Sequence, residues 1–265
     1  MAHTQYPRFG LFNTEERILH SDSLDQDYQV GIWFPFSYAS SDRKYPALYI
    51  LDGEFTFGLA TGLIPILIGA GEIPELIVVG LAHHGLSGWA EHGSLRERDF
   101  LPPIFQAPPA ESRLPAFTGF FKEQVFPLVE DEYCGSPDDR LLFGFSAGGL
   151  FAIHCLLTQP GMFRRILAAS CTWPKADDYL LDCETQYAAL PARPPADLYL
   201  AIGELDAEQL PGFRKLAERL ITRNYPGLRL FTEVLEGEGH SAGVLAKTLL
   251  NGLRAVYKSQ AERYE

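Results

Sequence analysis

Short runs of apolar residues recur along the chain and alternate with stretches in which apolar positions repeat every three or four residues. The short runs are typical of buried strands, and the longer spacing is typical of helices with one buried face. Their alternation predicts a mainly parallel sheet covered by helices on both faces. We expect strands near 28–35, 46–51, 76–82, 140–145, 163–169, 197–202 and 229–235. We expect helices near 114–132, 147–158, 207–223 and 242–258.

The stretch up to about residue 35 has a different pattern, because Val30, Ile32 and Phe34 occupy alternate positions. Such alternation is typical of antiparallel strands at the edge of a sheet. The chain has 265 residues, of which 46% are hydrophobic, so it can bury a large core. No internal repeat or linker divides it, and we expect one α/β domain over residues 1–265.

The strand predicted at 140–145 ends in the motif Gly144-Phe145-Ser146-Ala147-Gly148, and an apolar helical pattern follows. A serine at such a strand-to-helix turn is held in a strained backbone with its hydroxyl exposed. Small neighbours are needed because the strand and the helix approach closely. The alternative is a glycine-rich turn without chemistry. The motif predicts that Ser146 is a nucleophile.

A serine hydroxyl needs a base, usually a histidine oriented by a carboxylate, and in such motifs the acid and then the histidine follow the serine in the chain. Only two of the seven histidines, His154 and His240, follow Ser146. His154 is eight residues further along the same predicted helix, roughly 12 Å along its axis, and cannot reach back. His240 lies in a glycine-flanked loop after the strand at 229–235 and is the predicted base.

The acid is predicted from the segment Gly203-Glu204-Leu205-Asp206, which follows the strand at 197–202. Both carboxylates precede His240. Asp206 is favoured because three residues past the glycine allow the loop to turn back toward the histidine. Glu204 remains an alternative, and Glu236 or Glu238 could also substitute. The last alternative is a serine–histidine pair without an acid.

Acyl transfer through a serine also needs hydrogen-bond donors for the developing oxyanion. One is expected to be the backbone N–H of Ala147, the residue after the nucleophile. The second is expected from the segment after the strand at 46–51, where the N–H of Glu54 is the best candidate. Asp52-Gly53 is also an ordinary turn signal.

A long connection, residues 83–112, leaves the carboxyl end of a strand and is predicted to be an active-site loop. Trp89 and Arg98 are its candidate substrate-binding residues. A structural ion pair between Arg98 and Asp99 is an equal alternative. The histidines at 83, 84 and 92 have no carboxylate or cysteine partner at ligand spacing, so no metal is expected.

Several segments together resemble the putative-esterase group of α/β hydrolases, which includes esterase D and enterochelin-esterase-like enzymes. The matching segments are residues 45–53, 77–81, 96–102, 144–149 and 239–240. The resemblance implies an α/β-hydrolase fold and a serine esterase that cleaves a small-molecule ester without metal or organic cofactor. The family includes siderophore trilactone esterases, formylglutathione hydrolases, feruloyl and acetylxylan esterases, and mycolyl transferases.

The resemblance leaves three functions open. A general or siderophore-type ester hydrolase is favoured. An acyltransferase or thioesterase with the same triad is the second, and a catalytically silent hydrolase fold used for binding is the third. The formylglutathione hydrolases carry His-Ser-Met-Gly-Gly at the nucleophile, whereas this chain has Phe145-Ser146-Ala147-Gly148-Gly149.

The net charge of −12 argues against nucleic acid and anionic membranes as partners. The longest uncharged stretch, residues 55–71, is shorter than the about 20 apolar residues that span a membrane. Four cysteines without Cys-x-x-Cys spacing predict free thiols in a cytoplasmic protein. An anionic siderophore would need a local positive mouth, for which Arg96, Arg98, His83 and Arg113 are candidates. No pattern specifies an oligomeric state.

Overall fold

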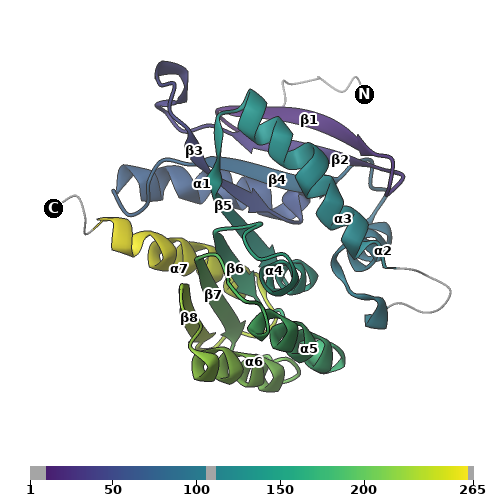
Figure 1. Ribbon diagram of the computed structural model, residues 1–265. Coiled ribbons are helices and arrows are strands. Elements are labelled where there is room, and N and C mark those ends of the chain that lie inside the picture. The colour runs from purple at the N-terminus through teal and green to yellow at the C-terminus, as the bar shows by residue number, and fades with distance from the viewer. Residues whose placement is uncertain (1–9, 106–111, 262–265) are drawn as a thin grey trace.

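A single sheet organises the part of the chain that the computed structural model describes, residues 10–105 and 112–261 (Figure 1). Its order is β1-β2-β4-β3-β5-β6-β7-β8. The strands are β1 (Thr14–Ser21), β2 (Gln26–Trp33), β3 (Tyr45–Ile50), β4 (Ile77–His83), β5 (Gly135–Phe145), β6 (Arg165–Ala169), β7 (Ala196–Gly203) and β8 (Leu228–Leu235).

The sheet is mainly parallel, as predicted. Strand β2 pairs antiparallel with both β1 and β4, and the other neighbouring strands pair in parallel. The antiparallel edge expected near the N-terminus is therefore confirmed, and it includes β1 as a further strand. Because the parallel strands run in one direction, their carboxyl ends meet at one edge of the sheet, where open α/β sheets place ligand-binding groups.

Helices cover both faces of the sheet. They are α1 (Gly53–Gly69), α2 (Trp89–Phe100), α3 (Leu114–Phe120), α4 (Ala147–Thr158), α5 (Asp177–Ala188), α6 (Leu210–Arg223) and α7 (Ala242–Ala261). Apolar side chains of α1 and α7 pack on one face, and those of α2 to α6 pack on the other. Short helical segments are η1 (Tyr38–Ser40), η2 (Pro103–Phe105), η3 (Phe121–Val125), η4 (Leu128–Glu132) and η5 (Pro174–Ala176).

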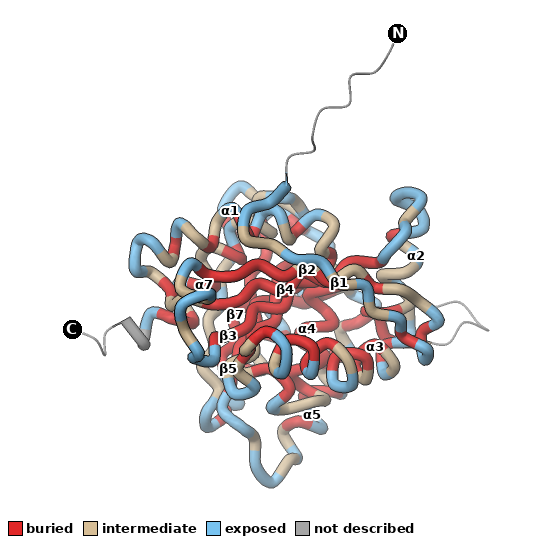
Figure 2. Tube along the Cα trace, turned by 90° about the horizontal axis from the view of Figure 1, so that it is seen from above, coloured by how far each residue is buried: buried red, intermediate tan, exposed pale blue. Residues whose placement is uncertain are grey.

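The core follows the period of two that a strand imposes on its side chains. In β3, Tyr49 belongs to the core on the α2–α6 face, whereas Leu48 and Ile50 belong to the core on the α1 and α7 face. Figure 2 shows the strands buried through the middle of the molecule, with exposed residues on the outer helices and loops. This double burial explains why the strands are continuous apolar runs in the sequence.

The predicted loop at 83–112 is wrong for much of its length, because it contains helix α2 and the η2 turn. Helix α2 lacks an apolar stripe: two of its three buried residues are His92 and Asp99, so hydrophobic periodicity gives no signal. Residues 106–111 of that segment lie outside the described residues. Helices α1 and α5 were also not predicted.

No helix in the described ranges combines the length and the apolar character needed to cross a membrane. The four cysteines are unpaired, as expected, and three of them are buried.

Candidate active site

Ser146 lies at a sharp turn between β5 and α4. Its backbone angles are φ 61° and ψ −122°, a strained combination for a residue with a side chain. The N–H of Ser146 donates to the carbonyl of Ala169 on the neighbouring strand at 2.8 Å. The turn depends on Gly144, because a Cβ atom there would overlap the carbonyl of Gly148. The hydroxyl of the half-buried serine is thereby held beyond the end of the sheet.

Two loops bring His240 and Asp206 to this serine. The Nε2 atom of His240 lies 3.0 Å from Oγ of Ser146, and its Nδ1 atom lies 3.0 Å from Oδ2 of Asp206. If Nδ1–H donates to the carboxylate, Nε2 is free to accept the hydroxyl proton. The Asp206 side chain is buried, whereas that of His240 is 38% exposed. The structure thus brings together the three residues that the sequence predicted as a catalytic unit.

The histidine and acid loops are packed directly against each other. A Cβ atom on Gly203, the last residue of β7, would overlap the carbonyl oxygen of Glu238. One residue after Glu204, the N–H of Leu205 donates to that same carbonyl at 2.7 Å. The close approach of the two backbones fixes the separation of Asp206 and His240, since each lies within three residues of the contact.

Gln209 is a member of the site that the sequence did not indicate. Its backbone N–H donates to Oδ1 of Asp206 at 3.4 Å, and its side-chain Nε2 lies 3.3 Å from Nδ1 of His240. The buried hydroxyl of Thr172 donates in turn to the Gln209 carbonyl at 2.9 Å. No motif surrounds Gln209, so sequence reasoning had no signal for it.

Two of the alternative acids, Glu204 and Glu238, have other partners. Glu204 accepts the backbone N–H of Gly237 at 3.0 Å. Glu238 accepts the hydroxyl of Ser241 at 2.7 Å and pairs with Lys247 at 2.8 Å. These contacts stabilise the histidine loop. Among the carboxylates considered, Asp206 is therefore the one that the structure places against the imidazole.

The two expected oxyanion donors lie at the starts of two neighbouring helices. Ala147 is the first residue of α4, and Glu54 is the second residue of α1. N–H groups in a first helical turn have no partner within the helix and carry the positive end of its dipole. The helix starts adjoin, because a Cβ atom on Gly148 would lie 3.3 Å from Leu51 and 3.6 Å from Asp52. Both amides thus lie at helix starts that adjoin the turn of Ser146, and their role as oxyanion donors stays a prediction.

Arg96 of α2 links these two helix starts. Its guanidinium donates to both carboxylate oxygens of Asp52, at 2.5 and 2.9 Å, and to the carbonyl of Phe145 at 3.4 Å. Asp52 immediately precedes α1 and has a φ of 57°, while Phe145 immediately precedes Ser146. The bidentate geometry fixes the orientation of both groups. Arg96, one of the candidates for a local positive mouth, is thus bound between the two helix starts.

Asp52, Glu54 and His92 form a cluster in which one potential ligand atom from each residue lies within 4.8 Å of the others. The sequence had indicated no carboxylate partner for this histidine. Burial lowers the pKa of His92, and its Nε2 atom has no hydrogen-bond partner within the part of the chain that the structure describes. However, Arg96 already binds both oxygens of Asp52, and its positive charge opposes a cation at this point. The absence of a metal therefore stays a prediction.

Arg98 pairs with the fully buried Asp99. Its Nε and Nη2 atoms donate to the two carboxylate oxygens at 2.7 and 3.0 Å. Burial alone would raise the pKa of Asp99, but hydrogen bonds from His83, Arg98 and Tyr28 outweigh it and lower that pKa. The geometry favours the structural ion pair, the alternative that the sequence left open, over a substrate-binding role for Arg98.

Trp89, the other expected substrate-binding residue, has a different environment. Its side chain is 75% exposed and stacks on Phe55 of α1, with ring centroids 4.7 Å apart and an interplanar angle of 5°. His92 packs edge-on against both rings. Exposed aromatic pairs of this kind offer a flat apolar surface to a ligand.

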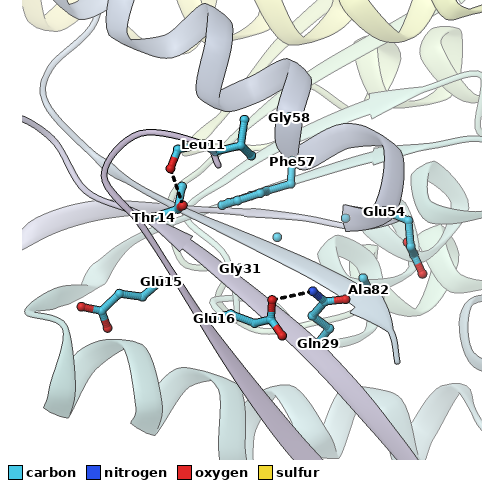
Figure 3. Close-up of a pocket in the computed structure, with 12 residues that line it drawn as sticks. Leu11, Thr14, Glu15, Glu16, Gln29, Gly31, Glu54, Phe57, Gly58 and Ala82 are labelled. Carbon is cyan, nitrogen blue, oxygen red and sulfur yellow. Dashed lines mark hydrogen bonds between the residues drawn. The ribbon is translucent and has the colours of Figure 1, made fainter. Parts of the chain in front are cut away.

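A cavity of about 530 Å³ lies between α1 and the first strands. Figure 3 shows Phe57 of α1 over Gly31, with Glu15 and Glu16 on the strand side and Glu54 toward one end. Ser146, Asp206 and His240 do not line it, but Glu54, whose N–H is one of the two expected oxyanion donors, does.

Comparison with known proteins gives consistent likenesses over most of the chain. A family model described as "Putative esterase" matches residues 21–217. Ferri-bacillibactin esterase BesA of Bacillus subtilis (strain 168) is 28% identical over 254 residues, which covers 88% of this chain and 86% of that protein.

Solved structures of similar proteins also match most of the chain. The BES protein from Bacillus cereus has a TM-score of 0.84 at 26% identity and covers 96% of this chain and 98% of its own. Siderophore hydrolase EstA from Aspergillus nidulans has a TM-score of 0.80 at 19% identity, with coverages of 97% and 99%, and this likeness shows the fold alone. Together with the sheet order, these findings confirm the expected α/β-hydrolase fold.

The contact between Arg96 and Asp52 predicts that these two residues act as a unit. Arg96→Gln should lower kcat/KM for p-nitrophenyl acetate about tenfold, because the buried Asp52 carboxylate loses its partner and the turn before α1 can shift. Asp52→Asn should have a similar effect. The double variant should lose less than the sum of the single losses, with a coupling of about 0.5–3 kcal/mol. Strict additivity would contradict the prediction.

The contact between Arg98 and Asp99 predicts a structural effect. Arg98→Ala leaves a buried carboxylate uncompensated, and because Arg98 is partly exposed the loss of stability should be near the lower end of about 3–5 kcal/mol. A thermal melt should show a lower Tm, and kcat/KM should fall equally for a neutral and an anionic ester. A loss restricted to the anionic ester, with an unchanged Tm, would instead assign Arg98 to substrate binding.

Proposed function

The chain belongs to the esterase family whose model matches residues 21–217, and from this premise we propose that it cleaves carboxylic esters through a catalytic triad of Ser146, His240 and Asp206. The observation that carries the proposal is the continuous chain of hydrogen bonds from Asp206 through the imidazole to the serine hydroxyl. This series of hydrogen bonds ends at Ser146, which lies on a strained strand-to-helix turn. In that setting a serine hydroxyl is exposed for attack.

In the proposed first half-reaction, Oγ of Ser146 attacks the ester carbonyl carbon while Nε2 of His240 takes the hydroxyl proton. Asp206 keeps the proton on Nδ1 and stabilises the imidazolium that forms. The negative charge on the carbonyl oxygen is bound by the N–H groups of Ala147 and Glu54. The tetrahedral intermediate then collapses, Nε2 gives its proton to the leaving alkoxide, and an acyl-enzyme remains.

In the second half-reaction, water replaces the alcohol. His240 takes a proton from the water as it attacks the acyl carbon, and Ser146 leaves with that proton restored to Oγ. The partial exposure of His240 supports this step, because the imidazole is accessible to solvent once the alcohol has left. The products are a carboxylic acid, an alcohol and the free enzyme.

The proposed substrates are siderophore esters. The support is the 28% identity to ferri-bacillibactin esterase over 88% of this chain, and the likeness at 26% identity to the BES protein of Bacillus cereus. Within this proposal, Trp89 and Phe55 form an aromatic surface for the substrate beside the start of α1. A flat aromatic surface suits the planar rings that many siderophores carry.

The proposal predicts that Ser146 alone carries the acyl group. Ser146→Ala should lower kcat for p-nitrophenyl acetate by about 10⁴-fold or more with an unchanged melt, and a fluorophosphonate probe should modify only this residue. Ser40→Ala, at an exposed serine in η1, is the matched control and should keep full activity. Mass spectrometry that located the adduct on Ser170 or Ser241 would rule out the assignment.

A second prediction separates the candidate acids. His240→Ala should cost nearly as much activity as Ser146→Ala, and Asp206→Asn should lower kcat by a smaller factor, on the order of 10⁴ or below. Glu204→Gln and Glu238→Gln, measured in the same assay, should have minor effects because their partners are Gly237, Ser241 and Lys247. An enzyme disabled by Glu204→Gln but active as Asp206→Asn would identify Glu204 as the acid.

A further inference from the structure

Three side chains, Phe105, Trp173 and Lys175, form a cluster beside His240 that has no part in the proposed triad. The ring centroids of Phe105 and Trp173 are 5.9 Å apart at an interplanar angle of 71°. The Nζ atom of Lys175 lies 5.3 Å from the centroid of Phe105. Trp173 adjoins the imidazole, with ring centroids 6.4 Å apart. The cluster is therefore connected to the reacting groups through His240.

The cluster is anchored in the core but is not part of it. Phe105 and Trp173 are partly buried and pack against the core on the α2–α6 face, while Lys175 is exposed. The backbone on both sides of Trp173 is fixed by hydrogen bonds. Before it, the hydroxyl of Thr172 donates to the backbone carbonyl of Gln209, and after it, the N–H of the buried Ala176 donates to the Trp173 carbonyl at 2.7 Å. Two aromatic side chains that are packed against the core on one side and accessible to solvent on the other are suited to contact a ligand.

Lys175 supplies a positive charge that the expected cations do not. Arg96 is bound to Asp52, Arg98 to Asp99, and the guanidinium of Arg113 donates to the Ser23 carbonyl at 2.8 Å. Across residues 10–105 and 112–261, no carboxylate forms an ion pair with Lys175, whose contact is the Phe105 ring. Lys175 is therefore an exposed cation without a carboxylate partner among the described residues, and the rings of Phe105 and Trp173 connect it to His240.

The position beside His240 indicates which part of an ester the cluster would meet. During cleavage, Nε2 of His240 donates its proton to the leaving oxygen, so the alcohol portion must lie against the imidazole. The oxyanion donors at Ala147 and Glu54 instead define the side of the carbonyl oxygen. A group that extends from the alcohol portion past His240 therefore reaches Trp173.

We propose that Phe105, Trp173 and Lys175 form a leaving-group subsite that binds a planar aromatic ring with negatively charged oxygen substituents. The inference rests on the proposed function, because it places the alcohol portion by the role of His240. The two aromatic side chains contact the face and edge of the ligand ring, and the ammonium group binds its anionic oxygens. The subsite would select esters whose alcohol portion carries an anionic aryl group.

The test compares phenyl acetate with 4-acetoxybenzoate, which share the acetyl group and differ by a carboxylate on the leaving phenol. Lys175→Ala should lower the ratio of kcat/KM for the anionic ester to that for the neutral ester on the order of tenfold. Lys175→Glu should lower the ratio further, and Lys175→Arg should restore it. Lys258→Ala, at an exposed lysine roughly 24 Å along α7 from its start, is the matched control and should leave the ratio unchanged. An unchanged ratio in Lys175→Ala would overturn the subsite.

A binding measurement separates this inference from the proposed catalytic function. Ser146→Ala is titrated with 4-hydroxybenzoate, the product anion, and followed by tryptophan fluorescence. Adding Lys175→Ala should raise the Kd on the order of tenfold. If neither acetate is turned over by the unaltered enzyme, the proposed function fails while this titration still tests the subsite. Equal Kd values with and without Lys175 would overturn the subsite alone.

Discussion

The crowded turn after β5 is the constraint on which the candidate active site depends. The overlap that a side chain at Gly144 would cause, and the positive φ of Ser146, show how closely the strand and α4 approach. Because β5 lies inside a parallel sheet, the ends of its neighbours surround this turn. The start of α1 follows β3 on one side, and the loops that carry Asp206 and His240 follow β7 and β8 on the other. Each chemical role is thus assigned to the carboxyl end of a different strand.

Behind this edge, α2 presents an ionic face to the interior. His92, Arg96 and Asp99 are spaced by four and three residues, which places them on one side of a helix. Removing charges from water is costly, and such pairs are often no more stabilising than apolar packing. Their directional hydrogen bonds do fix geometry, however, because Arg96 ties the residue before α1 to the residue before Ser146. Position, more than stability, is what this face contributes to the site.

The three residues of the proposed triad could be named from the sequence because their signals are local: a motif at Ser146, and polar residues in the loops after apolar strands at Asp206 and His240. Reasoning from sequence patterns failed for helices whose position is determined by tertiary packing. Helix α1 is apolar on all sides and has little periodicity, and α2 is buried through polar residues. The side chain of Gln209 reaches His240 only because two loops distant in sequence meet. Parallel register made the strand ends predictable, whereas side-chain contacts between helices were not.

The electrostatics of the site follow from the same local contacts. A net charge of −12 suggests repulsion of an anionic ester, yet at physiological ionic strength charges farther away than about 8 Å are largely screened. What an approaching anion meets is therefore set by the nearest side chains. Arg96 and Arg98 are each paired with a buried carboxylate, whereas Lys175 is exposed and lies over the ring of Phe105. An acidic protein can in this way bind an anionic substrate, provided that its cations nearest the reacting groups are not already paired.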